Sequence, residues 1–183
     1  IQSGHVTGEK KTLHHRKVAS SIIMGSKALY DFIDHNEMIE MYPVNHMNDP
    51  YVIGQNDRMV SINSCLEIDL YGQVASEAIG LEQFSGTGGQ VDYLRGAKRS
   101  RGRRSILAFT STAKGGTVSR IVPVLPPGAT VTSGRNEVDY IATEYGAVRL
   151  RGLTLRERAL ALVSIAHPDF RPGLMAVVEE RFS

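Results

Sequence analysis

The sequence contains one cysteine, Cys65, among 183 residues. A single cysteine excludes an internal disulfide framework and favours a reducing compartment. No stretch approaches eighteen continuous apolar residues, and Glu9, Lys10, Lys11, Arg16 and Lys17 lie within the first twenty positions. This pattern predicts neither a membrane-spanning helix nor a signal peptide, so we expect a cytoplasmic protein.

The sequence also lacks the common nucleotide and metal motifs. No Gly-Lys-Ser/Thr triplet is present, which excludes a P-loop, and Val91 stands where a dinucleotide fingerprint needs its third glycine. Only two of the six histidines, His14 and His15, are neighbours, and no carboxylate or cysteine lies at metal-ligand spacing from them. We therefore expect no metal site.

The composition is that of one globular domain over residues 1–183, with 42% hydrophobic and 22% charged residues. Short runs rich in Val and Ile alternate with turns drawn from eighteen glycines and seven prolines, which predicts an α/β fold. The predicted strands cover 18–24, 39–44, 59–70, 74–79, 105–110, 118–125 and 138–142. Helices are predicted after Ser26, after a Thr154–Glu157 capping box, and after Pro168, and a polar turn is predicted over 45–50.

Strict alternation over 59–70 predicts a strand with one buried and one available face. The expected core positions are Val60, Ile62, Leu66, Ile68 and Leu70, and the expected available positions are Ser61, Asn63, Cys65, Glu67 and Asp69. For Cys65, which has no histidine nearby in sequence, we expect a packing role.

Three features of the sequence could take part in ligand binding or catalysis. The segment 85–90, Ser-Gly-Thr-Gly-Gly-Gln, offers backbone N–H groups that a thioester carbonyl or a phosphate can approach closely, although a structural turn explains it equally well. Glu67, Asp69 and Glu144 are carboxylates that could act as a nucleophile or a base, and spacing does not choose among them. A basic run over 95–104 predicts a solvated loop or a contact with an anionic partner, through Arg95, Lys98, Arg99, Arg101, Arg103 and Arg104.

Taken together, several strings resemble the C-terminal domain of the acetyl-CoA hydrolase/transferase family. They are Met-Tyr-Pro-Val and Asn-Asp-Pro over 41–50, Ser-Ile-Asn-Ser at 61–64, the glycine-rich segment continued to Asp92, 111–123, Val-Asp-Tyr at 138–140, Thr-Glu-Tyr-Gly at 143–146, Leu-Arg-Glu-Arg at 155–158 and Ala-His-Pro-Asp-Phe at 166–170. The similarity covers essentially the whole chain. Each string is modest alone, but their order and spacing make the match specific.

The resemblance implies an open mixed, largely parallel sheet flanked by helices, of the isomerase/CoA-transferase type. It implies CoA transfer between a short-chain acyl-CoA and a carboxylic acid of the 4-hydroxybutyrate, butyrate or acetate type, through a glutamyl-CoA thioester. CoA is then a substrate, and no tightly bound cofactor is expected. In the family the nucleophilic glutamate precedes the segment with which this chain starts, so we expect it upstream of Ile1, together with an N-terminal domain, and the chain alone to be inactive.

The resemblance also assigns site residues. Asn48 matches an asparagine that polarises the thioester carbonyl, and Gly89 matches a glycine whose backbone N–H does the same and contacts CoA. Leu66 aligns with a CoA-contacting position, Ser85 stands where some members have an asparagine at the CoA site, and Gly88 belongs to the same loop. For the basic run we hypothesise contacts with CoA phosphates.

Three other functions stay open at this level. Acyl-CoA hydrolysis differs only in that water resolves the intermediate. A nucleic-acid-binding module would rest on the basic run alone, without interleaved aromatics, so neither nucleic acid nor a membrane is an expected partner. A non-catalytic assembly subunit is the third, and the expected partners include the protein's own N-terminal domain and further copies in a homo-oligomer.

Overall fold

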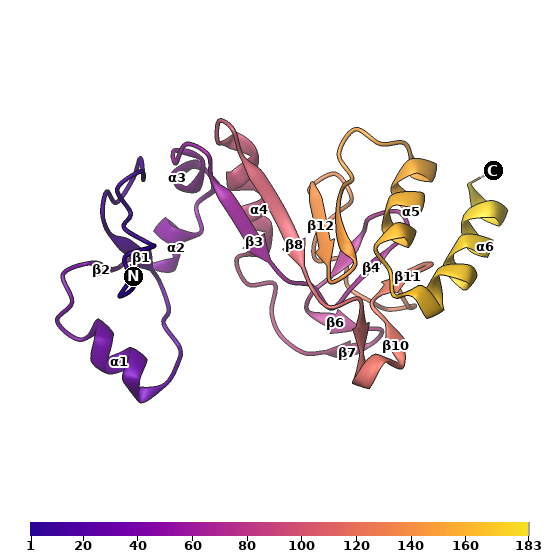
Figure 1. The fold of residues 1–183 in the computed structure, drawn as a ribbon, viewed down its shortest axis with the longest axis horizontal. Helices are drawn as coiled ribbons and strands as arrows, with labels where there is room; N and C mark the ends of the chain where they lie inside the picture. The colour runs from indigo at the N-terminus through magenta and orange to yellow at the C-terminus, as the bar shows by residue number, and fades with distance from the viewer. Residues whose placement is uncertain (183) are drawn as a thin grey trace. The chain divides into compact units, whose positions relative to one another are not determined.

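The computed structural model describes residues 1–182 (Figure 1). The chain divides into two compact units, one comprising 1–59 with 95–103, and the other comprising 60–94 with the chain from Arg104 onward. Within the described residues, every helix is too short or too polar to cross a membrane. Elements and contacts are given below for each unit separately.

The first unit contains a small β-α-β motif. Strands β1 (Val18–Ser20) and β2 (Ile39–Met41) pair in parallel and are joined through helix α1 (Lys27–Ile33). Ser26 caps α1 as predicted, because its side chain accepts a hydrogen bond from Leu29 N. The strands are shorter than the sequence predicted, since each ends within three residues.

The predicted polar turn over 45–50 is wrong, because most of this stretch is helical. Helix α2 (Val44–Met47) is followed by helix α3 (Pro50–Gly54). Asp49 accepts a hydrogen bond from Tyr51 N at 2.8 Å, and Pro50 occupies the first turn of α3. A side-chain cap followed by proline is a helix start, which explains why these turn-forming residues begin a helix here.

The predicted basic loop is also wrong over most of its length. Helix α4 (Gln90–Arg99) contains three of its six cations, Arg95, Lys98 and Arg99. Cations in the last turns of a helix interact favourably with its dipole, which is the physical reason for this placement. The Arg99 guanidinium lies 4.0 Å from the centre of the Tyr51 ring, so this exposed cation packs on the aromatic ring of α3.

The second unit is built on a four-stranded sheet in the order β13-β12-β8-β3. The pairs β3 (Val60–Asn63) with β8 (Arg104–Ala108) and β8 with β12 (Tyr140–Thr143) are parallel, and β12 forms an antiparallel hairpin with β13 (Gly146–Arg149). A second sheet has the order β11-β4-β5, from Ile121–Val122, Glu67–Asp69 and Val74–Ala75. The mixed α/β architecture predicted from the sequence is confirmed.

Two short hairpins complete the strands of this unit. One pairs β6 (Ala78–Ile79) with β7 (Glu82–Gln83), and the other pairs β9 (Thr112–Ala113) with β10 (Val118–Ser119) around the glycine turn 114–116. Helices α5 (Leu155–Ser164) and α6 (Arg171–Arg181) then lie side by side (Figure 1). The predicted capping box at α5 is confirmed, because Thr154 and Glu157 bond reciprocally.

The alternation predicted over 59–70 is wrong for six of its ten assigned positions. Val60 and Ile62 are exposed, whereas Ser61, Cys65, Glu67 and Asp69 are buried with Ile68 and Leu70. The stretch is two strands rather than one, because the chain leaves the first sheet after Asn63 and enters the second at Glu67. Strand β4 lies between two partners and is buried at every position, so the rule that one face of a strand is available does not apply.

Candidate functional site

The glycine-rich segment is an exposed loop that leads directly into α4. It follows the β6–β7 hairpin, where the N–H groups of Phe84 and Ser85 both donate to the carbonyl of Glu77. All residues from Leu81 to Gly88 are exposed. Gly88 has φ +56°, a conformation that favours glycine, and a Cβ at this position would meet no atom within 4 Å. The loop is therefore anchored at its start and open along its length.

The backbone at the end of this loop can bind an anion. Gly89 immediately precedes α4, and its carbonyl accepts a hydrogen bond from Tyr93 N. Within residues 1–182, the Gly89 N–H has no hydrogen-bond acceptor. Because α4 has ten residues, its first N–H groups carry the positive end of an aligned row of peptide dipoles. A carbonyl oxygen that gains negative charge would be stabilised at this point.

Ser85 shapes the loop, and its hydroxyl and carbonyl make only local bonds. Its hydroxyl donates to the carbonyl of Gly86 at 3.0 Å, and its own carbonyl accepts from Gln83 Nε2 at 2.5 Å. The Ser85 side chain is exposed, so it remains accessible to a ligand.

Leu66 has little backbone hydrogen-bonding capacity left for a ligand. Its N–H donates to the carbonyl of Ala75 at 2.9 Å, and its carbonyl accepts from Arg120 Nε at 2.8 Å. The same guanidinium donates to the carbonyl of Cys65 and to Thr110 Oγ1. Arg120 thus holds the 65–66 backbone in place. Reasoning from the sequence missed this role, because the two segments are more than fifty positions apart.

Asn48 lies in the first unit, at the junction between α2 and α3. Its N–H donates to the carbonyl of Val44 at 2.8 Å and thereby closes the single turn of α2. Its side-chain amide makes no hydrogen bond to any of the residues 1–182, and the residue is half-buried. An amide held on a fixed backbone with free N–H donors is the group that carbonyl polarisation requires.

The three candidate carboxylates differ in environment. Burial raises the pKa of Glu67, which is 7% exposed and whose Oε1 has no partner. Burial also raises the pKa of Asp69, whose carboxylate accepts from Tyr71 N, Gln73 N and Gln73 Nε2 and so fixes a turn. Glu144 accepts hydrogen bonds from Ser111 N and Oγ, so it ties two segments together.

Cys65 is buried, and burial raises the pKa of its thiol to about 12. A thiol with that pKa carries almost no thiolate at neutral pH, so the packing role expected from the sequence agrees with its environment. Over residues 1–182, no group of three or more His, Cys, Asp or Glu side chains is arranged to hold a metal ion.

Comparison with known proteins identifies the family. The sequence profile of the acetyl-CoA hydrolase/transferase C-terminal domain matches residues 25–178. The chain belongs to the acetyl-CoA hydrolase/transferase family. It is 55% identical over 182 residues to the 4-hydroxybutyrate coenzyme A transferase of Clostridium kluyveri, covering 100% of this chain and 42% of that protein. It is 40% identical over 182 residues to the butyryl-CoA:acetate CoA-transferase of Anaerostipes caccae, covering 98% of this chain and 41% of that protein.

Solved structures agree with this assignment. The 4-hydroxybutyrate CoA-transferase of Porphyromonas gingivalis is 59% identical and superposes with a TM-score of 0.85, over 100% of this chain and 42% of that one. RipA from Yersinia pestis is 44% identical with a TM-score of 0.92, over 100% and 41% of the two chains. The chain therefore spans about two fifths of the length of the family members that it matches.

The residues that the family resemblance assigned are divided between the two units. Asn48 belongs to the first unit, whereas Leu66, Ser85, Gly88 and Gly89 belong to the second. Within the second unit, Ser85, Gly88 and Gly89 share one loop, and Leu66 is joined by hydrogen bonds to β5 and to Arg120.

Proposed function

We propose that this chain is the CoA-binding half of a cytoplasmic CoA-transferase that moves CoA between a short-chain acyl-CoA and a carboxylic acid. The observation that carries the proposal is the unpaired N–H of Gly89, at the start of a ten-residue helix and at the end of an open glycine-rich loop. Family membership and the names of similar proteins supply the substrate class, which is acyl-CoA with 4-hydroxybutyrate, butyrate or acetate.

In this proposal Asn48 and Gly89 stabilise the oxyanion that forms at the thioester carbonyl. A carboxylate attacks that carbon, the C=O bond becomes a C–O⁻ bond, and the amide N–H of Asn48 and the backbone N–H of Gly89 donate to the new charge. The attacking glutamate comes from a part of the full-length protein outside this chain, since Glu67, Asp69 and Glu144 are buried or committed to structural hydrogen bonds. Collapse of this adduct expels the CoA thiolate and leaves an acyl-glutamyl anhydride; the thiolate then attacks the glutamyl carbonyl, which releases the donor acid as its carboxylate and forms the glutamyl-CoA thioester. The acceptor carboxylate attacks that thioester, and the same two steps in reverse give the new acyl-CoA and free the glutamate.

Asn48→Ala in the full-length protein tests the proposal. With acetyl-CoA and butyrate as substrates, we expect kcat to fall about 100-fold, the usual loss when one oxyanion donor is removed. Asn45→Ala is the matched control, because Asn45 is an exposed asparagine on α2, the turn that ends at Asn48, and we expect it to keep the wild-type rate. A loss that is equal in both variants, or absent from both, would contradict the role of Asn48.

The same assay separates transfer from hydrolysis. Transfer produces butyryl-CoA in step with the loss of acetyl-CoA, whereas hydrolysis releases free CoA thiol without needing butyrate. We expect butyryl-CoA to account for nearly all of the acetyl-CoA consumed.

A further inference from the structure

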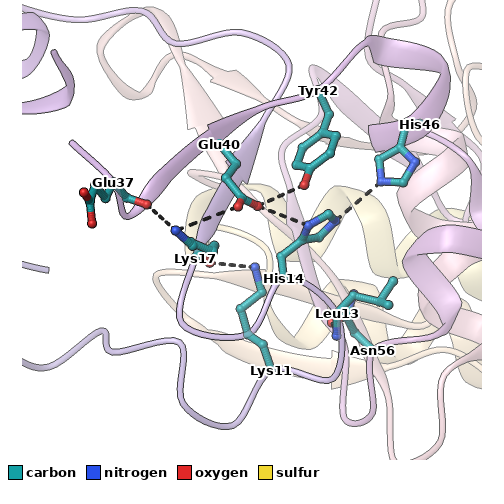
Figure 2. A network of polar contacts seen from close by, with 9 residues as sticks. All are labelled: Lys11, Leu13, His14, Lys17, Glu37, Glu40, Tyr42, His46 and Asn56. Carbon is teal, nitrogen blue, oxygen red and sulfur yellow. Dashed lines mark hydrogen bonds and ion pairs between the residues drawn. The ribbon is translucent and has the colours of Figure 1, made fainter. Parts of the chain in front are cut away.

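A network of polar side chains in the first unit is centred on His14, and the chemistry proposed above makes no use of it (Figure 2). His14 Nδ1 lies 3.5 Å from Glu40 Oε2 on β2, and His14 Nε2 lies 3.4 Å from His46 Nε2 on α2. The Tyr42 hydroxyl donates to the same Glu40 oxygen at 3.0 Å. The ring of Tyr42 packs against both imidazoles, with centroids 4.6 and 4.9 Å away.

The residues just before His14 form hydrogen bonds with the segment that follows α3. Leu13 N donates to Asn56 Oδ1 at 3.1 Å, and Asp57 N donates to Thr12 Oγ1 at 3.0 Å. Asn56 and Asp57 follow α3, whereas His46 lies on α2. The segment 12–14 therefore contacts both ends of the stretch 46–57, which includes Asn48.

The position of Asn48 depends on contacts between α2 and residues outside that helix. Helix α2 has only four residues, and a single turn is not stable by itself in water. Among residues 1–182, the backbone of Asn48 hydrogen-bonds only to this turn, through the carbonyls of Val44 and His46. Because His46 is anchored to His14 and Tyr42, these contacts determine where the turn, and with it the Asn48 amide, is held.

The contact between the two imidazoles depends on their protons. A hydrogen bond between two ring nitrogens needs a proton on one and a lone pair on the other, so the pair tolerates a total charge of zero or +1. With both rings protonated, two N–H groups face each other. The Glu40 carboxylate pairs with His14, but Lys17 Nζ also lies 3.9 Å from the same carboxylate. Lys11 Nζ in turn donates to the backbone carbonyl of Lys17. The Glu40 carboxylate is therefore shared between His14 and Lys17.

We propose that His14 is a positioning residue for the transferase reaction: its contacts with His46 and Glu40 fix the α2–α3 junction that carries Asn48, and a second proton on the His14–His46 pair releases that junction. The inference rests on the proposed function for its effect on catalysis. Its structural part, that His14 orders residues 44–57, is independent of that function.

A double-mutant cycle in the full-length protein tests the catalytic part. We expect His14→Ala to lower kcat about tenfold with KM for acyl-CoA within about twofold, but to lower kcat by less than about twofold when Asn48 is already alanine. His14→Gln, which keeps a polar group at the end of the side chain, should recover most of the rate. His35→Ala is the control, because the His35 side chain is 96% exposed and lies outside the network. Equal losses in the two backgrounds, or no loss at all, would overturn the inference.

The proton-dependent part predicts a shifted pH profile. The hydrogen bond between the two ring nitrogens is lost when both carry a proton, so the loss of kcat on the acid side should move to lower pH in His46→Gln. An acid limb that stays in place would overturn the release step.

Amide hydrogen exchange tests the structural part of the inference and requires no activity assay. We expect residues 44–57 to exchange at least about tenfold faster in His14→Ala than in the wild type or in His35→Ala. Unchanged protection overturns the positioning role, even in an active enzyme. Faster exchange in a protein that transfers no CoA would retain the positioning role and contradict only the proposed function.

Discussion

At the scale of single residues, Gly96 shows how one missing methyl group sets the packing of two helices. Gly96 lies inside α4, and a Cβ added there would lie 2.5 Å from Ile53 Cβ on α3. This distance is shorter than van der Waals contact allows, so the added atom would clash. Ile53 is buried, with 4% of its surface exposed, so it has little room to move away. A glycine is therefore required where α3 crosses α4, although alanine is the better helix former.

Gly96→Ala should consequently destabilise the protein despite its gain in helix propensity. The propensity gain is about 1 kcal/mol, whereas overpacking a buried contact costs about 1–3 kcal/mol, so we expect a net loss of up to about 2 kcal/mol in the free energy of unfolding. Gly173→Ala is the matched control, because Gly173 lies in α6 with nothing within 4 Å of its added Cβ, and it should stabilise slightly. Chemical denaturation of both variants measures the free energy of unfolding. A Gly96→Ala protein as stable as the wild type would contradict the clash.

At the scale of secondary-structure elements, Glu144 joins the β12–β13 hairpin to the start of the β9–β10 hairpin. Burial raises the pKa of Glu144, but hydrogen bonds from Ser111 Oγ at 2.6 Å and Ser111 N at 2.8 Å outweigh it and hold the pKa below its usual value. Since the folded pKa is depressed, the ionised carboxylate stabilises the fold above the unfolded pKa of about 4.3, and this contribution is lost as the pH falls through the folded value.

Glu144→Gln should therefore destabilise the protein at pH 7 and make less difference at pH 3.5. Because Glu144 is exposed, water screens the interaction, and we expect a loss of only about 1 kcal/mol at pH 7. Glu180→Gln, an exposed change on α6, is the control. Thermal unfolding across this pH range measures the effect, and a difference from the wild type that is independent of pH would show that the carboxylate charge is not involved.

Elements with local start and stop signals were predictable from the sequence, whereas pairing between distant segments was not. Ser26 and the Thr154–Glu157 box identified their helices because a cap is a bond between residues three positions apart. The burial of Glu67 and Asp69 was not predictable, because it depends on β11 and β5 pairing on either side of β4. For the same reason, the anchoring of Leu66 by Arg120 had no local signal.

The candidate site shows the same division. The composition of the glycine-rich loop predicted either an anion-binding segment or a structural turn, and the structure adds that the Gly89 N–H is unpaired at a helix start. Asn48 was assigned only through family resemblance, because one asparagine in a polar stretch carries no pattern. The His14 network was missed altogether, since its members come from three separate segments and only their fold brings them together.

At the scale of the whole molecule, the chain matches about two fifths of its relatives' length, and its three candidate carboxylates, Glu67, Asp69 and Glu144, are buried or engaged in structural hydrogen bonds. We therefore expect the purified 183-residue chain to exchange no CoA between acetyl-CoA and butyrate, while co-production with the remainder of the protein restores exchange. Circular dichroism of the isolated chain is the control for folding, because an unfolded chain would be inactive for another reason. Turnover by a folded, isolated chain would show that the nucleophile lies within it, and Glu67→Gln, Asp69→Asn and Glu144→Gln would then identify which carboxylate attacks.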